Sequence, residues 1–177
     1  SCGYWPARHH VHLIERLEAV ARGELTRLAV FAPPGSAKST YTSVLFPAWL
    51  MAQPPPRGPA WDIIGASHTA TLAEEFSRKV RARVRLHPDL LGYSLAADSQ
   101  AVDRWATSKG DVFRAVGATG AVTGQRADVI ILDDPIRGRE QADSPAQREK
   151  VWQWFNDDLR TRAKPGAAVV LVQTRWH

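Results

Sequence analysis

The residues with the clearest chemical potential form the stretch FAPPGSAKST, residues 31–40. A lysine and a hydroxyl residue that follow several small residues are typical of a phosphate-binding loop. In such a loop backbone N–H groups cradle the phosphates, the lysine reaches the outer phosphates and the hydroxyl binds magnesium. Lys38 and Ser39 stand at these positions. The usual pattern G-x-x-x-x-G-K-[ST] has glycines where this chain has Ala32 and Ala37, so a strict pattern search fails.

The chemistry requires small residues near the phosphates rather than glycine itself, because backbone amides make the cradle. An apolar strand expected over 25–32 enters the stretch and a helix expected over 38–50, bent near Pro47, leaves it; this context favours a nucleotide site. The alternative is an ordinary strand-to-helix turn whose lysine faces solvent. The residues predicted to contact ATP are Pro34, Gly35, Ser36, Ala37, Lys38, Ser39 and Thr40.

A second element, VIILDD, ends an apolar run with Asp133 and Asp134. Hydrolysis of ATP needs a carboxylate that holds Mg²⁺, often through its water shell, and usually a second that positions the attacking water. We therefore predict that Asp133 binds magnesium together with Ser39, and that Asp134 is the catalytic base. An N-cap or turn pair before Pro135 is the alternative. Two independent motifs in this order favour the nucleotide site.

The elements that must position these residues alternate along the chain. A helix is predicted over 10–21. A second is predicted where Leu72, Phe76, Val80 and Val84 recur on one helical face. A third is predicted to begin at a capping box at Ser144 and to end at Pro165. Strands are predicted over 25–32, 61–67, 103–108, 111–117, 127–134 and 167–174. The pattern predicts an α/β domain with a mainly parallel sheet, helices on both faces and ligands at the carboxyl ends of the strands.

Composition limits the partners and the class of protein. The 177 residues suffice for one globular domain, and no apolar run approaches the roughly 20 residues that span a bilayer. We expect a soluble protein inside the cell. The single cysteine, Cys2, excludes an internal disulfide and a Cys-rich zinc site. A net charge of +5 favours a polyanionic partner such as nucleic acid.

Several segments together resemble the ATPase domain of the large terminase subunit of tailed bacteriophages or related prophages. They are FAPPGSAKS, IIGASHTATLAEEFSRKVR, GATGAVTGQRADVIILDDPIRGREQADS, VWQWFNDDLRTR and VVLVQTRWH, and they cover nearly the whole chain. The resemblance implies a P-loop NTPase fold of the RecA-like, ASCE type over residues 1–177, with ATP and Mg²⁺ as ligands. It also implies double-stranded DNA, the portal protein and the small terminase subunit as partners, a homo-oligomeric ring and the host bacterial cytoplasm as location.

The resemblance also assigns roles to matched positions. Thr174 falls in the motif that couples loss of the γ-phosphate to movement. Many relatives carry an arginine inside the loop where this chain has Gly35, so the positive charge must come from Arg126, from Arg175 or from a neighbouring subunit. Related motors often have glutamate where this chain has Asp134.

Other functions stay open at this stage. The chain could be a catalytically silent nucleotide-binding or assembly module, such as a prophage remnant, or a helicase-like motor. Large terminases carry an RNase H-like nuclease domain after the ATPase domain. Nothing follows His177 and no second acidic cluster is evident, so we expect no DNA cleavage.

Other histidine, tryptophan and basic residues could either take part in binding or serve only the structure and the surface. His9, His10 and His12 do not share one helix face as metal ligands do, which favours satisfied or solvated side chains. Trp5 either stacks on adenine or packs on the domain. The basic run 78–85 is a solvated face or a DNA contact.

Overall fold

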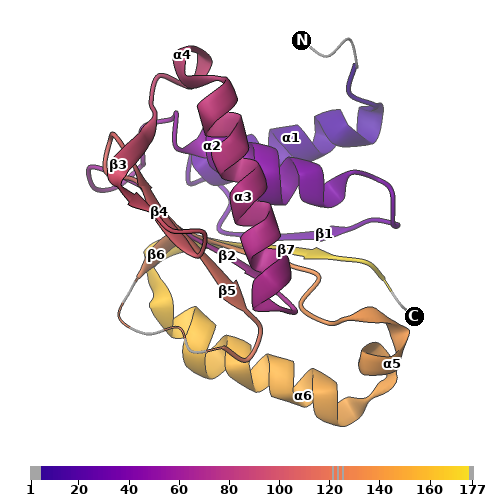
Figure 1. Ribbon diagram of the computed structural model, residues 1–177. Helices are drawn as coiled ribbons and strands as arrows, with labels where there is room; N and C mark the ends of the chain where they lie inside the picture. Colours follow the sequence, from indigo (N-terminus) through magenta and orange to yellow (C-terminus); the bar gives the residue numbers. More distant parts are fainter. Residues whose placement is uncertain (1–4, 121, 123, 125, 176–177) are drawn as a thin grey trace.

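The computed structural model describes residues 5–120, 122, 124 and 126–175. They form a seven-stranded sheet in the order β1-β7-β6-β2-β5-β4-β3 (Figure 1). The strands are β1 (Arg27–Phe31), β2 (Asp62–Ser67), β3 (Leu95–Gln100), β4 (Arg104–Thr107), β5 (Val112–Gly117), β6 (Ala127–Asp133) and β7 (Ala163–Gln173).

Five neighbouring strands of this sheet run parallel. β1 pairs with β7, β7 with β6, β6 with β2 and β2 with β5, all in parallel register. β4 and β3 extend the sheet beyond β5 as antiparallel strands. The predicted α/β fold with a mainly parallel sheet is confirmed.

Helices cover both faces of the sheet (Figure 1). α1, α2 and α3 lie on one face and α5 and α6 on the other. Their bounds are α1 (Arg8–Ala21), α2 (Phe46–Leu50), α3 (Ala70–Leu86), α4 (Pro88–Leu91), α5 (Gly138–Asp143) and α6 (Pro145–Trp154), with π-helical segments η1 (Thr40–Leu45) and η2 (Phe155–Leu159) and a 3₁₀ turn η3 (Arg160–Arg162).

Strand β6 shows how the sheet is held between two cores. Val129 and Ile131 pack in the cluster that includes α1 and α3, whereas Ile130 and Leu132 pack in the cluster that includes Trp154 of α6. Alternate residues of a strand point to opposite faces, so a strand buried on both faces is apolar throughout. The run VIIL therefore places Asp133 at the end of a central, rigid strand.

The helix after the loop is irregular for a local reason. Pro47 has no N–H, and its ring crowds the carbonyl four residues earlier, so the α-helical hydrogen bond that residue 47 would donate to that carbonyl cannot form. The preceding segment η1 widens instead, and Phe46 N–H bonds the carbonyl of Tyr41, five residues back. The bend predicted near Pro47 therefore takes the form of a π-helical segment beside the loop.

The predicted helix end at Pro165 is wrong. Helical structure ends at Arg162, and Pro165 and Gly166 lie inside strand β7. The pairing of β7 with β6 shifts register between Ala127 and Val129, opposite this proline, because proline cannot donate to the strand ladder. Strand β3 and helix α5, which no clear periodicity marks, were not predicted.

Candidate nucleotide-binding site

The loop of residues 32–37 connects β1 to the helix that begins at Lys38. Its first residue, Ala32, donates its N–H to the carbonyl of Gln173 in the next strand, at 3.4 Å. Gly35 has φ +77° and Ala37 has φ +58°. The left-handed region costs a residue with a Cβ about 1–2 kcal/mol. Ala37 therefore adopts the conformation that the missing glycine of the motif would take without strain.

Lys38 lies at the base of this loop with little contact to solvent. It is 8% exposed, and its Nζ lies 3.6 Å from Oδ2 of Asp134. A lysine so buried needs an anionic partner, because an unpaired charge away from water is costly. The alternative of an ordinary turn required Lys38 to face solvent, and the structure does not place it there.

Asp133 is held by two hydroxyl groups from the same helix. Ser39 Oγ donates to Oδ1 at 3.0 Å and Ser43 Oγ donates to Oδ2. Burial raises the pKa of Asp133 above the ordinary aspartate value, and the hydrogen bonds from Ser43 and Ser39 oppose that rise. The two serines thus fix the carboxylate and favour its charged form, as a magnesium-binding residue requires.

Asp134 is joined to the end of strand β7 by its backbone and its side chain. Its N–H donates to the carbonyl of Val172 at 2.8 Å, and its Oδ1 accepts the N–H of Thr174 at 2.7 Å. Asp134 has φ +42°, a conformation that aspartate tolerates better than most residues. The backbone of Thr174, rather than its hydroxyl, makes the recorded contact with this carboxylate.

The residues present fit a phosphate and its magnesium ion. Ser36 Oγ is buried in the loop and has no hydrogen-bond partner within the described part of the chain. Among the same residues no group of three or more His, Cys, Asp or Glu could hold a metal by itself. Ser39 and Asp133 can therefore supply only part of a coordination shell, and Mg²⁺ commonly completes such shells with phosphate oxygens and water.

The other residues predicted to contact ATP differ in their exposure. Pro34 and Gly35 form the exposed tip, Ser36 and Ala37 are half-buried, and Thr40 opens segment η1. Apart from Gly35 itself and its two chain neighbours, no atom of the described residues lies within 4 Å of where a Cβ on Gly35 would stand, so the tip is open.

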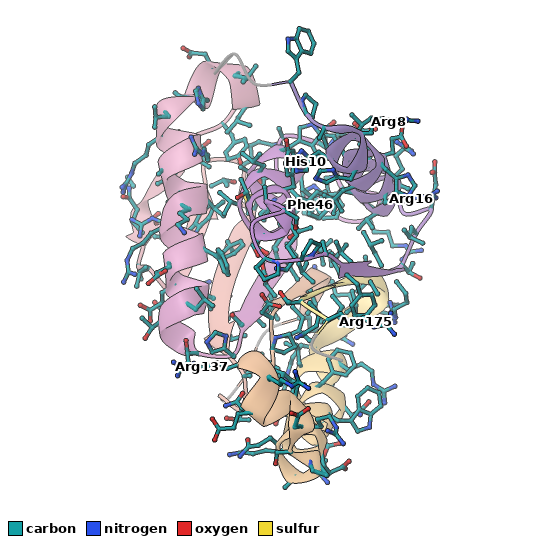
Figure 2. The ribbon with its side chains drawn as sticks, turned by 90° about the vertical axis from the view of Figure 1, so that its right-hand side faces the viewer. Arg8, His10, Arg16, Phe46, Arg137 and Arg175 are labelled. Carbon is teal, nitrogen blue, oxygen red and sulfur yellow. The ribbon has the colours of Figure 1, made fainter. Side chains whose placement is uncertain are left out.

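The two arginines named from the sequence lie at different ends of the sheet. Arg175 follows Thr174 and is exposed on the side where the parallel strands end, as is Arg137 at the start of α5 (Figure 2). Arg126 precedes the first residue of β6, whereas Asp133 is the last. Seven residues of strand span roughly 23 Å. Arg126 is therefore not brought to the carboxylates of its own chain.

Three contacts of the site were missed in the sequence. Ser43, one helical turn after Ser39, binds Asp133, and its i+4 spacing was the available signal. Ser67 Oγ donates to the carbonyl of Asp133 at 2.8 Å, and His68 Nδ1 lies 3.2 Å from the carbonyl of Asp134. Both follow from the parallel pairing of β2 with β6, which no local pattern reveals.

Comparison with solved structures identifies the fold. The chain aligns with the large terminase of bacteriophage HK97 over 86% of its length and 30% of that chain, with a TM-score of 0.55 and 12% identity. It aligns with the large terminase of a thermophilic bacteriophage over 90% of its length and 38% of that chain (TM-score 0.57, 10% identity). It aligns with the ATPase domain of the Thermus phage P74-26 large terminase over 96% of its length and 70% of that chain, with a TM-score of 0.56 and 14% identity.

The chain therefore has an α/β fold built on a mainly parallel sheet. More specifically, it has the fold of large terminase ATPase domains, as the sequence resemblance implied. It spans about a third of the two whole terminases, 30% and 38%. No protein-family model matches the sequence, and no curated protein matches it.

Proposed function

We propose that this chain is a magnesium-dependent ATPase that drives viral double-stranded DNA into a procapsid. The observation that carries the proposal is the convergence of Lys38 with Asp133 and Asp134. The lysine starts the helix after β1. Asp133 is the last residue of β6, two strands away in the sheet, and Asp134 follows it. A cation and two carboxylates at the carboxyl edge of a parallel sheet are the groups that phosphoryl transfer to water needs.

Each side chain has a distinct task in this proposal. The loop amides and Lys38 bind and orient the phosphates, and Ser39 and Asp133 hold the magnesium ion, which neutralises charge on the phosphate oxygens when bound. Asp134 orients a water molecule and accepts its proton. Thr174, whose N–H binds Asp134, passes a change at this carboxylate to strand β7. Catalysis would rest on positioning and charge stabilisation rather than on a covalent intermediate.

The partners follow from the proposed motor role. The net charge of +5 suits a polyanion such as double-stranded DNA. The proposed assembly is a homo-oligomeric ring at the portal, loaded with the help of the small terminase subunit in the host cytoplasm. Among the described residues no helix is long and apolar enough to cross a membrane. Arg126, exposed and far from its own carboxylates, would act on a neighbouring subunit of such a ring.

A second candidate function is a nucleotide-binding module that does not turn over. One observation favours it: both oxygens of the Asp134 carboxylate have partners, the N–H of Thr174 and the amine of Lys38. A base held in this way has fewer acceptor sites left for an attacking water molecule. A helicase-like motor remains the third candidate, and we base no argument for it on the contacts described above.

Hydrolysis measurements separate the first two candidates. ATP turnover would be measured with and without double-stranded DNA and the small subunit, with Lys38→Ala as the control. Hydrolysis that DNA stimulates and that Lys38→Ala abolishes would support the motor. Tight ATP binding without turnover in every condition would support the silent module.

A further inference from the structure

Helix α1 contacts the loop 32–37 through one histidine. His10 Nε2 lies 3.0 Å from the backbone carbonyl oxygen of Ser36, 26 positions later in the chain. The other ring nitrogen, Nδ1, accepts the backbone N–H of Ala7 at 3.2 Å. A nitrogen that accepts a hydrogen bond carries no proton, so the proton of this imidazole is on Nε2. His10 therefore donates to the loop carbonyl.

The same ring also contacts the helix that leaves the loop. It stacks on Tyr41 of η1, with ring centroids 4.6 Å apart and an angle of 26° between the planes. Figure 2 shows His10 between α1 and this helical segment. One side chain thus holds both the loop and the first turn after Lys38 against α1.

The bond to Ser36 determines where the next amide points. None of the described peptide bonds is cis. In a trans peptide the C=O and the N–H point in opposite directions. Because the carbonyl of Ser36 points to His10, the N–H of Ala37 points away from α1, and Ala37 keeps its positive φ of 58°. A glycine would hold this conformation without help, whereas alanine is strained in it.

We propose that His10 is a positioning residue that compensates for the missing loop glycine. Its hydrogen bond keeps the Ser36–Ala37 peptide in the orientation that presents the Ala37 N–H to a phosphate. The inference rests on the proposed nucleotide site and adds to it the residue that maintains the cradle. His10 itself touches no phosphate.

Two substitutions of His10 separate the hydrogen bond to the loop from the rest of the side chain. In His10→Asn the amide can still accept the Ala7 N–H but is too short to reach Ser36, whereas in His10→Gln the amide N–H₂ stands near the position of Nε2. His12→Asn is the matched control, because His12 is an exposed histidine of the same helix whose Nδ1 lies 3.8 Å from Oε2 of Glu15, also in α1.

Binding of a fluorescent ADP analogue in MgCl₂ is the measurement. We expect His10→Asn to weaken binding about three- to tenfold, the effect of one hydrogen bond, and His10→Gln and His12→Asn to stay within about twofold of the unaltered chain. Urea unfolding of each variant confirms that the protein tested is folded. Equal weakening by Asn and Gln would overturn the inference.

The double variant tests the compensation directly. In the Ala37→Gly background the peptide keeps its orientation without His10, so His10→Asn should then cost less than about twofold in affinity. An undiminished loss there would overturn the compensation. If Lys38→Ala abolishes nucleotide binding but His10→Asn leaves it unchanged, the role given to His10 is wrong and the proposed function stands. If the unaltered chain binds the nucleotide no better than Lys38→Ala does, both the proposed function and this inference are wrong.

Discussion

Ser39 and Asp133 stand 94 positions apart in the chain, yet Ser39 Oγ donates a hydrogen bond of 3.0 Å to Asp133 Oδ1. The contact exists because β1 and β6 run parallel with only β7 between them, so the loop after β1 and the end of β6 meet at one edge of the sheet. The fold therefore brings the two proposed magnesium-binding groups together. Ser43, on the other oxygen of the carboxylate, keeps it in place.

The two serines should differ in what they contribute to magnesium. We expect Ser39→Ala, which removes a proposed ligand, and Ser43→Ala, which frees one oxygen of Asp133, each to raise the Mg²⁺ concentration needed for tight nucleotide binding about tenfold or more. Titration of Mg²⁺ at fixed fluorescent ADP measures this. Ser77→Ala is the control, since Ser77 is a buried serine whose hydroxyl bonds the carbonyl of Val102. A normal Mg²⁺ requirement in Ser43→Ala would contradict the role given to it.

Asp134 should separate binding from hydrolysis. Asp134→Asn keeps an oxygen that can accept the Thr174 N–H but removes the proton acceptor. We expect hydrolysis to fall about 10²- to 10⁴-fold while nucleotide affinity changes only a few-fold. Asp134→Glu, which restores a carboxylate, should retain more turnover than the asparagine variant. Single-turnover hydrolysis and nucleotide titration check both, and full turnover by Asp134→Asn would exclude this residue as the base.

Arg126 should act between subunits if it acts at all. Its place before β6, at the end of the strand opposite Asp133, predicts that Arg126→Ala lowers DNA-stimulated hydrolysis without weakening nucleotide binding. Mixing Arg126→Ala protein with Lys38→Ala protein should restore part of the activity, because one partner then supplies an intact loop and the other an intact arginine. Full activity of Arg126→Ala alone would end this hypothesis. Arg175→Ala tests the alternative source within one chain.

Tyr93 should make the fold sensitive to alkali. Its hydroxyl donates to the carbonyl of Ala48 at 2.6 Å, and burial, with a smaller effect of Asp111, raises its pKa above the ordinary tyrosine value. A raised folded-state pKa means that stability is present below about pH 10, the unfolded value, and is lost as the pH rises further.

Replacement of Tyr93 by phenylalanine provides the test. Tyr93→Phe should cost about 1 kcal/mol at neutral pH, the value of one hydrogen bond, and should lose stability less steeply above pH 10 than the unaltered chain. Urea unfolding at a series of pH values measures both effects. Identical slopes above pH 10 would show that another group controls the alkaline transition.

Local patterns in the sequence were enough to predict the α/β class, the loop at Lys38 and Ser39, and the paired carboxylates at the end of a doubly buried strand. These features depend on residue type and spacing over short stretches, where strand and helix periodicities and small loop residues are visible directly. The same local reasoning misplaced the helix end at Pro165, because a bulge that admits proline into a strand depends on the partner strand.

Tertiary structure alone decided which of these residues meet. Three hydrogen bonds of the site join segments that are 26 to 90 positions apart in the chain. They link Ser43 with Asp133, Thr174 with Asp134, and His10 with Ser36. It also placed Arg126 away from the carboxylates that follow it in sequence. Such contacts are set by strand order and register, which depend on the packing of the whole sheet between its two layers of helices and not on any single stretch of chain.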